Sequence, residues 1–407
     1  MPDIHLHARR VKQLIKRSNL SGTFVVGKYR FSPYHACEHG CAYCDGRAER
    51  YYVEGDFERD IVMRENAPEL LKREVTKLRE RGWITLSSGV SDVYQPVEKE
   101  NMVTRKCAEI LRHAGFPITI MTKSDLVLRD LDIWSDIASS VGCMIIVSLT
   151  FADDSIRKPF EPSASSVEDR LHVLDAAKSA GCYTGVLAMP LIPFITDTED
   201  QISRLYDRLL AVDPDFIMPA GLTLRPGRQK RHFLKMIKRY DPRLVAPISE
   251  IYREEWPSGA STRVYRRDLQ KKIKQAVVRT GKSFLVPHYV YAPRLHRYDA
   301  LSVLLSHMDE LYSLHEVDTI RLQEARKRFV TWIVEKKSTY NRRPSTRYED
   351  FDREVAEAFS SGELESVFAN PKLHQFCSKI VLDGDLFDYE SVISGAGHSD
   401  HDRISKD

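Results

Sequence analysis

The chain has 407 residues, of which 42% are hydrophobic and 29% are charged, and its formal net charge is +3. This length exceeds that of a usual single domain and the hydrophobic content can bury a core, so we expect a globular protein of more than one module. The sequence has no run of ~18 apolar residues, which argues against a transmembrane helix. Its N-terminus has charges where a signal peptide needs an apolar stretch, which argues against a signal peptide. We therefore expect a soluble, cytoplasmic protein without membrane contact.

The first 22 residues form a basic arm in which Asp3 is the single acid. We expect a solvated, partly ordered terminus here, with an arm that contacts nucleic acid as the alternative. A β-prone run over residues 23–26 follows and leads into a loop rich in cysteine. The bases of the arm are Arg9, Arg10, Lys12, Lys16 and Arg17.

Strand and helix patterns alternate about six times from residue 23 to residue 219. The segment 143–150 is a continuous apolar run of the kind that parallel sheets bury on both faces. A helix over 68–81 has Pro68 near its first turn and Gly82 just past its end, which is the asymmetry that helices prefer. The alternation favours parallel βαβ units, with a doubly wound open sheet as the alternative arrangement. The other expected strands are 83–86, 117–122, 184–189 and 215–219, and the other expected helices are 98–114, 127–139, 166–180 and 199–212.

The composition changes after residue 224. Residues 225–282 hold 17 Lys or Arg against 5 Asp or Glu, and helical apolar spacing follows at 299–314, 318–336 and 348–359. The end of the chain is acidic and is typical of a disordered tail. We therefore expect four parts: a basic N-terminal arm over 1–22, an α/β domain over 23–224, a basic and helical C-terminal region over 225–393, and a disordered acidic tail over 394–407.

Three of the seven cysteines, Cys37, Cys41 and Cys44, lie within eight residues with the spacing C-x3-C-x2-C. Such a cluster of soft ligands, in a chain without an export signal, points to metal rather than to a disulfide. Three thiolates suit a four-iron four-sulfur cluster, because they hold three irons and leave the fourth open to another ligand. A structural zinc is the alternative and would recruit His35 or His39, although no second ligand pair follows at the spacing that zinc sites usually have.

The cysteine spacing, with Tyr43 directly before the last cysteine, resembles the radical S-adenosylmethionine (SAM) superfamily. Ser32-Pro33-Tyr34 before the motif and Cys37-Glu38-His39-Gly40-Cys41 within it are similar to the spore photoproduct lyase-like (DNA repair photolyase-like) branch. The resemblance covers residues 30–220, about half of the chain. It implies a partial (β/α)6 TIM-type barrel, which six units fit better than a complete eight-unit barrel. The implied cofactors are a 4Fe-4S cluster on the three cysteines and SAM.

The resemblance also implies SAM contacts at the C-terminal ends of the strands, where a barrel presents its active site. Ser88 and Gly89 correspond in position to the segment that grips the amino group of SAM, although the glycine-glycine-glutamate form is missing. Lys123 matches a lysine that holds the SAM carboxylate. An exposed surface lysine is the alternative for Lys123.

Two further residues enter through the same resemblance. Ser148 is similar to the SAM-contacting serine of the lyase. Tyr43 either packs on the adenine of SAM or shields the cluster from water, and both arrangements exclude water from a redox centre. Glu161, in a Phe-Glu-Pro sequence that also looks like this branch, is either part of the site border or structural.

The departures from the branch are equally informative. Spore photoproduct lyase has a cysteine that returns a hydrogen atom to the product radical, and Ser88 or Gly89 stands in that place here. The residue after the last cluster cysteine is Asp45 rather than an aromatic. We therefore carry over the initiating chemistry and not the lyase reaction.

Two functions from different classes follow. In the first, a low-potential electron donor such as a flavodoxin or ferredoxin reduces the cluster, SAM is cleaved to a 5′-deoxyadenosyl radical, and the radical abstracts hydrogen from an unidentified substrate. In the second, the chain is a non-catalytic nucleic-acid-binding protein with a structural metal. The basic segment 225–282 bears on both, because its charges and interleaved aromatics suit DNA or RNA. A solvated helical face and an acidic protein partner are the alternatives for that segment.

Overall fold

The chain folds into two compact units, each assembled from separate stretches of sequence. The computed structural model describes residues 3–18, 20, 25–87, 89–340 and 348–395. Unit 1 consists of Met1–Arg17, Tyr29–Thr76 and Ile84–Thr280, and unit 2 consists of Ser18–Lys28, Lys77–Trp83 and Gly281–Asp407. Unit 1 thus includes residues 225–280, which the composition of the sequence groups with the C-terminal region. The four expected domain ranges stay predictions, and nearly all of the expected tail lies outside the described residues.

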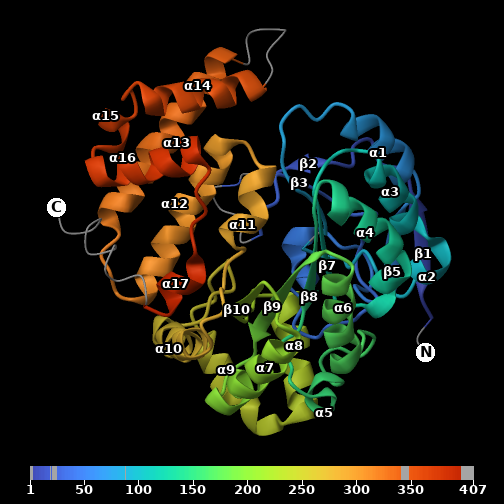
Figure 1. Ribbon diagram of the computed structural model, residues 1–407. Helices are drawn as coiled ribbons and strands as arrows, with labels where there is room; N and C mark the ends of the chain where they lie inside the picture. The colour runs from blue at the N-terminus through green and yellow to red at the C-terminus, as the bar shows by residue number, and fades with distance from the viewer. Residues whose placement is uncertain (1–2, 19, 21–24, 88, 341–347, 396–407) are drawn as a thin grey trace. The chain divides into compact units, whose positions relative to one another are not determined.

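The centre of unit 1 is a sheet with the strand order β10-β9-β8-β7-β6-β3-β2 (Figure 1). The six strands from β3 to β10 in this order are all parallel, and their spatial order follows their order along the chain without a reversal. A doubly wound sheet reverses its strand order at a switch point, so the fold is the partial barrel that we expected. The strands are β2 Lys16–Arg17, β3 Tyr29–Phe31, β6 Ile84–Leu86, β7 Ile118–Thr122, β8 Cys143–Ser148, β9 Tyr183–Leu191 and β10 Phe216–Gly221.

The helices between these strands cover the outer side of the sheet (Figure 1). Helix α4 packs on β8, and α6 packs on β8 and β9. Helix α6 begins with a capping box, in which the Ser166 hydroxyl accepts from the Asp169 amide and the Asp169 carboxylate accepts from the Ser166 amide. The helices are α1 Ala67–Val75, α2 Glu98–Asn101, α3 Val103–Arg112, α4 Leu131–Ser140, α5 Asp154–Arg157, α6 Val167–Ser179 and α7 Glu199–Val212.

Four expected elements differ from the structure. The helix expected over 68–81 ends at Val75, so Gly82 does not stand just past its end, because residues 77–83 join unit 2, where Glu80 pairs with Lys28. The expected helix 98–114 is broken at Met102, which has a left-handed backbone (φ 53°) and separates α2 from α3. The first turns expected in 127–139 are a 3-10 helix over Asp125–Asp130. The expected strand at 23–26 is wrong at its two described residues, Val25 and Val26, because the first parallel strand begins at Tyr29.

The basic N-terminal arm forms a strand. Strand β1 (His5–Arg9) pairs in parallel with β5 (Asp60–Arg64), and β5 pairs antiparallel with β4 (Tyr34–His35). All five residues of β1 are exposed, as we expected of a solvated arm, but hydrogen bonds from His5 and His7 to Asp60 help to order it.

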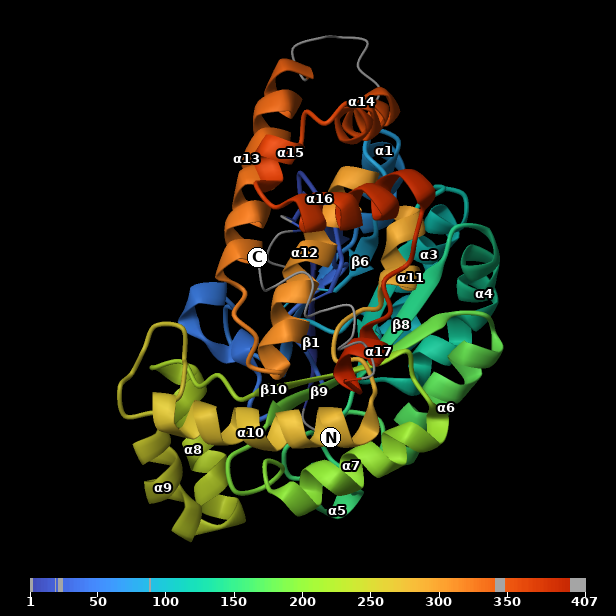
Figure 2. The same ribbon diagram turned by 60° about the vertical axis from the view of Figure 1, so that its left-hand side comes forward.

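Three helices complete unit 1: α8 Arg228–Tyr240, α9 Val245–Ile251 and α10 Arg263–Thr280 (Figure 2). The buried residues of α8 and α9, among them Phe233, Ile237 and Ile248, share one apolar cluster with Cys41 and Tyr43. The start of the basic segment therefore supplies part of the core beneath the cysteine loop.

Unit 2 is helical, which confirms the expected helical C-terminal region (Figure 2). The helix expected at 299–314 runs from Arg297 to Leu314 (α12), and the one expected at 318–336 runs from Ile320 to Tyr340 (α13). No helix in the described part of the chain is long and apolar enough to cross a membrane. The remaining helices are α11 His288–Tyr291, α14 Tyr348–Ser360, α15 Glu365–Phe368, α16 Pro371–Ser378 and α17 Tyr389–Ile393.

Candidate active site

The cysteine loop follows β4 and is shaped by its own backbone. Gly40 has a positive φ (66°), and a Cβ there would lie 3.2 Å from the Glu58 carboxylate and 3.3 Å from the Pro162 ring, so a side chain would be crowded and its backbone strained. The Arg47 guanidinium donates to the carbonyls of Gly40 and Cys41, both at 2.9 Å. These contacts stabilise the loop through a residue of its own short segment.

The three thiols are held away from water. Cys37 and Cys41 are buried and Cys44 is partly buried. Burial is the main cause that raises the pKa of all three, to about 12 for Cys41, and the Asp92 carboxylate and then the neighbouring thiols add to the increase at Cys37. A metal must therefore displace protons to bind here.

The donor set fits a cluster better than one ion. Within the described part of the chain, no group of three or more His, Cys, Asp or Glu side chains is arranged to hold a single metal ion. A four-iron cluster spreads its thiolate ligands over separate irons, whereas the ligands of zinc meet at one point. His39 is also unsuited as a fourth zinc ligand, because its Nε2 contacts Asp92 (3.1 Å) and its Nδ1 contacts the Ser163 carbonyl (3.1 Å).

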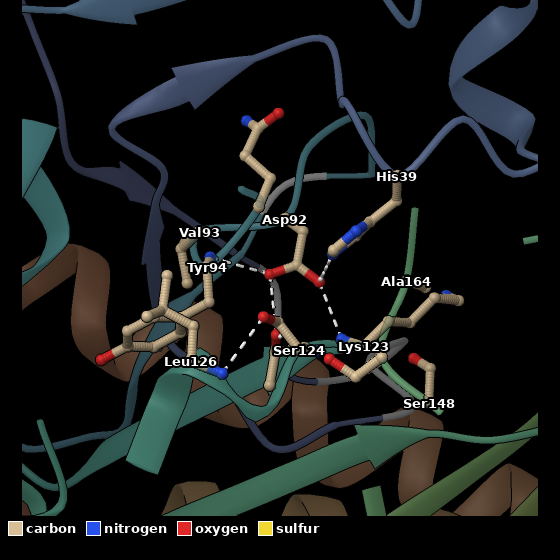
Figure 3. A network of polar contacts seen from close by, with 12 residues as sticks. His39, Asp92, Val93, Tyr94, Lys123, Ser124, Leu126, Ser148 and Ala164 are labelled. Atoms are coloured by element: carbon tan, nitrogen blue, oxygen red, sulfur yellow. Dashed lines mark hydrogen bonds and ion pairs between the residues drawn. The ribbon is translucent and has the colours of Figure 1, made fainter. Parts of the chain in front are cut away.

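Asp92, in the loop after β6, lies at the centre of a buried polar network (Figure 3). Its Oδ1 accepts from the Tyr94 amide and the Thr122 hydroxyl, both at 2.8 Å. Its Oδ2 accepts from His39 and from the Lys123 amide (2.7 Å). Burial alone would raise the pKa of Asp92, but His39 and the amide donors hold it at about 2.

A second buried network fixes Tyr43. The Tyr43 hydroxyl and the Arg170 guanidinium both donate to the Glu161 carboxylate, and Glu161 and Arg170 are completely buried. Arg170 also donates to the Ser148 carbonyl at the end of β8 (2.9 Å). Burial would raise the pKa of Glu161, but Arg170 and Lys123 lower it, so the carboxylate stays charged. The Tyr43 carbonyl accepts from the Gln229 amide of α8 (3.0 Å).

Four of the five expected SAM contacts lie in the described residues, and Ser88 lies outside them. Lys123 directly follows β7, and its ammonium is 5.9 Å from the Tyr43 ring centroid. Burial would lower the pKa of Lys123, but Cys41 and Glu161 raise it. Ser148 is the last residue of β8 and is seen with Lys123 in Figure 3, while Gly89 is exposed in the loop after β6.

Sequence reasoning missed the hydrogen-bonding roles of four residues. Asp92 and Gln229 are not among the residues that the sequence assigns to the site. His39 enters as a possible zinc ligand and within the motif that resembles the spore photoproduct lyase-like branch, and Arg170 enters only through the same resemblance. The available signal was an acid directly followed by the apolar pair Val93-Tyr94, which indicates a buried carboxylate in need of donors.

Comparison with known proteins identifies the family. The family model of the radical SAM superfamily matches residues 31–206. An uncharacterized protein of Methanocaldococcus jannaschii is 31% identical over 211 residues, which cover 51% of this chain and 75% of that protein. The chain belongs to the radical SAM superfamily.

Two other proteins are similar to this chain over about half of its length. An uncharacterized protein of Mycobacterium tuberculosis (strain H37Rv) is 28% identical over 233 residues, covering 56% of this chain and 67% of that protein. The "Radical SAM Nalpha-GlyT isomerase" of Pseudomonas phage M6 is 24% identical over 235 residues, covering 56% and 46%. Membership in the radical SAM superfamily makes the protein an enzyme, so the non-catalytic alternative is not supported.

The fold has a counterpart among solved structures. Spore photoproduct lyase complexed with dinucleoside spore photoproduct aligns with a TM-score of 0.50 and 15% identity, covering 67% of this chain and 79% of the lyase chain. At this identity the likeness concerns the fold alone. It agrees with the parallel sheet of the radical SAM type described above.

Proposed function

We propose that the protein binds a 4Fe-4S cluster through Cys37, Cys41 and Cys44 and binds SAM beside it, at the C-terminal ends of β6, β7 and β8. The observation that carries the proposal is the buried, hydrogen-bonded loop with three thiols next to the Lys123 ammonium. When bound and reduced by one electron, the cluster and SAM supply a 5′-deoxyadenosyl radical that abstracts hydrogen from the substrate. A flavodoxin or ferredoxin supplies the electron in our proposal, and the enzyme is cytoplasmic.

The residues of the chain bind and orient SAM. Lys123 pairs with the SAM carboxylate, since its ammonium is charged and close to the cysteine loop. Gly89 and Ser88 receive the amino group, and Ser148 contributes from the end of β8. Tyr43 offers only its ring to the adenine side, because its hydroxyl and carbonyl are engaged by Glu161 and Gln229.

Anaerobic reconstitution tests this proposal. The reconstituted protein should be brown with ~4 irons per chain, and incubation with SAM and dithionite should release 5′-deoxyadenosine. A colourless protein that contains zinc, or a fully loaded protein that leaves SAM intact, would overturn it.

For the substrate we propose a nucleic acid, on the evidence of the exposed charges of α10. Arg263, Arg267 and Lys271 recur every fourth residue, are exposed, and have no acidic partner within 4 Å among the described residues. Such a row can follow a phosphate backbone. The buried Leu269 and Val277 lie on the other side of this helix. Helix α10 therefore packs through its apolar side, and the basic side chains stay available to a ligand.

The aromatics of the basic segment contribute less than the sequence indicated. Phe233 is completely buried, and the Tyr265 hydroxyl donates to Asp197 (2.8 Å). Tyr240 is 40% exposed and Trp256, which also lies in the segment, is 50% exposed. Two aromatic side chains are therefore accessible for stacking, beside the phosphate contacts of α10.

Salt dependence tests the nucleic acid. Affinity for DNA or RNA should fall linearly with salt on a log–log plot, and the double variant Arg267→Gln/Lys271→Gln should reduce the slope for duplex DNA by about 2. The matched control is Lys272→Gln/Arg279→Gln on the same helix, whose side chains are already paired with Asp268 (2.8 Å) and Asp207 (3.0 Å). Equal slopes in the two double variants, or no retention at low salt, would remove this substrate class.

A further inference from the structure

The Asp92 carboxylate uses all of its hydrogen-bonding capacity on groups from three segments of unit 1 (Figure 3). His39 comes from the cysteine loop, Tyr94 from the loop after β6, and Thr122 and Lys123 from the end of β7. Each carboxylate oxygen accepts one hydrogen bond from a backbone amide and one from a side chain. A single buried side chain thus joins the proposed cluster loop to the strand end that carries the proposed SAM lysine.

The network continues from His39 to a third strand end. The Nδ1 atom of His39 contacts the Ser163 carbonyl, and the Ser163 amide donates to the His39 carbonyl (3.3 Å), so the loop after β8 is tied to the same histidine. Ala42 strengthens this connection by donating its amide to the Phe160 carbonyl (2.8 Å). The cysteine loop is therefore held from two sides.

We propose that Asp92 is a positioning residue that fixes the cysteine loop and Lys123 relative to each other, so that SAM binding depends on the His39–Asp92 contact. This inference rests on the proposed function. A buried carboxylate without its donors is costly, so the four donors must keep their positions as long as Asp92 is charged. Among the described residues the Asp92 carboxylate forms no hydrogen bond with the three cluster thiols or with the Lys123 ammonium, which distinguishes this role from a ligand role.

Asp130 provides a matched control. Its carboxylate is also completely buried and also contacts the segment after Asp92, because it accepts from the Tyr94 hydroxyl (3.0 Å). Its other partners are Arg105 (2.8 Å) and Arg129 (2.7 Å). None of these contacts reaches the cysteine loop or Lys123, so the loss of this charge should affect stability without affecting the site.

The decisive variant is Asp92→Asn. The side chain keeps its shape, but one oxygen becomes an amide group, and on either oxygen one donor is a backbone N–H that cannot become an acceptor. Whichever way the amide turns, either Tyr94 or Lys123 loses its partner. We expect SAM to bind about ten- to a hundredfold more weakly than to the wild type, while Asp130→Asn binds SAM as the wild type does.

A second measurement needs neither cluster nor SAM. In the iron-free protein, alkylation of Cys37, Cys41 and Cys44 by iodoacetamide, followed by mass spectrometry, reports how firmly the loop is held. Asp92→Asn should increase these rates several-fold and Asp130→Asn should not. If Asp92→Asn fails to fold, His39→Leu tests the same contact from the loop side, and His39→Gln, which keeps a donor near Nε2, should restore slow alkylation.

The outcomes separate this inference from the proposed function. If the wild type does not bind SAM at all, the proposed function fails, and the alkylation rates still decide whether Asp92 holds the loop. If the wild type binds SAM, and Asp92→Asn and His39→Leu match it in SAM affinity and in alkylation rates, the inference about Asp92 is wrong. A loss of stability in Asp92→Asn with unchanged SAM affinity and alkylation would also overturn it, because Asp92 would then be structural only.

Discussion

Glu161 in unit 1 and Glu80 in unit 2 are both buried carboxylates paired with cations, yet they stabilise different things. Glu161 accepts from Arg170 and from Tyr43, which lies between two of the cluster cysteines. Glu80 accepts from Lys28 (2.6 Å), Lys337 (2.9 Å) and the Tyr298 hydroxyl (3.1 Å). Both remain ionised, since burial would raise the pKa of each carboxyl but the neighbouring cations lower it.

The difference lies in what the partners belong to. The partners of Glu161 are parts of one site. The buried Glu161–Arg170 pair, despite its desolvation cost, therefore orients Tyr43 beside the thiols. The partners of Glu80 are Lys28, Tyr298 and Lys337, so this carboxylate joins stretches that are distant in sequence into one unit. A buried charge therefore indicates function only when its partners reach reactive groups.

Substitution of the cluster cysteines should have the largest effect on the site in unit 1. Replacing Cys37, Cys41 or Cys44 with Ala should abolish the visible absorbance of the reconstituted protein, because one iron loses its protein ligand. Cys107→Ala, which removes a buried thiol on α3, is the control and should keep its full iron content. Full iron content in a Cys41→Ala protein would contradict the cluster assignment.

Removal of Glu80 should damage unit 2 and spare the site. Glu80→Ala leaves Lys28 buried beside Asp299 alone and leaves Lys337 without this partner, so we expect a loss of about 3–5 kcal/mol in the free energy of unfolding. Chemical denaturation would measure this loss, and iron content after reconstitution at low temperature should match the wild type. A reduced iron content in a folded Glu80→Ala protein would contradict the view that Glu80 stabilises unit 2 without affecting the site.

Glu161→Gln should have the opposite signature. The amide keeps the shape of the side chain but removes the charge opposite the fully buried Arg170, at a cost of about 3 kcal/mol. Because Tyr43 shares this carboxylate, the electron paramagnetic resonance spectrum of the reduced cluster should also change. An unaltered spectrum, compared with that of Glu80→Gln, would reduce Glu161 to a structural residue.

Lys123→Ala should weaken SAM binding more than cluster assembly. Loss of one charge-assisted contact costs about 1.5–3 kcal/mol, or about ten- to a hundredfold in affinity. Equilibrium binding of SAM to the reconstituted protein measures this, with Lys178→Ala as the control because Lys178 is exposed and paired with Asp213. Unchanged SAM affinity in Lys123→Ala would assign Lys123 to the surface lysines.

Acid should loosen unit 2 through its buried histidines. Burial lowers the pKa of His288 to about 4 and those of His296 and His307 to about 3, mainly by desolvation. The unfolded chain binds these protons below about pH 6.5 and the folded chain does not, so stability is complete above that pH and falls as the pH drops toward 4. Between pH 6.5 and 5 the protonation of each histidine in the unfolded chain lowers the free energy of unfolding by about 2 kcal/mol. The buried Asp352 and the exposed Glu310, whose pKa values are raised, act in the opposite sense.

Hydrogen exchange, corrected for the intrinsic rates, would measure this acid sensitivity locally. Protection in α12 should fall from pH 6.5 to pH 5 by more than protection in β8. His307→Phe should reduce the fall, because one titrating group is gone. Equal losses in the two elements would contradict a specific role of these histidines.

The elements that sequence patterns predicted well are those whose signals are local. Helix α7 runs over 199–212 as expected, because Thr198 caps its first turn and acids follow directly. The buried strand β8 is apolar throughout, a pattern that needs no knowledge of its neighbours. The cysteine motif is local in the same sense, since its three thiols share one short loop.

Sequence by itself thus determined the repeated strand–helix units, the superfamily resemblance and the ligand chemistry of the cysteine loop, because spacing and apolar period encode these over a few residues. Only the tertiary structure decided that Asp92 meets His39, 53 residues away, and that Glu161 meets Tyr43. It also decided that residues 18–28 and 77–83 join unit 2. A buried carboxylate requires hydrogen-bond donors, and this requirement can be inferred from local sequence. Which donors reach it depends on how the ends of separate strands and their loops come together in the fold, and no local pattern carries that information.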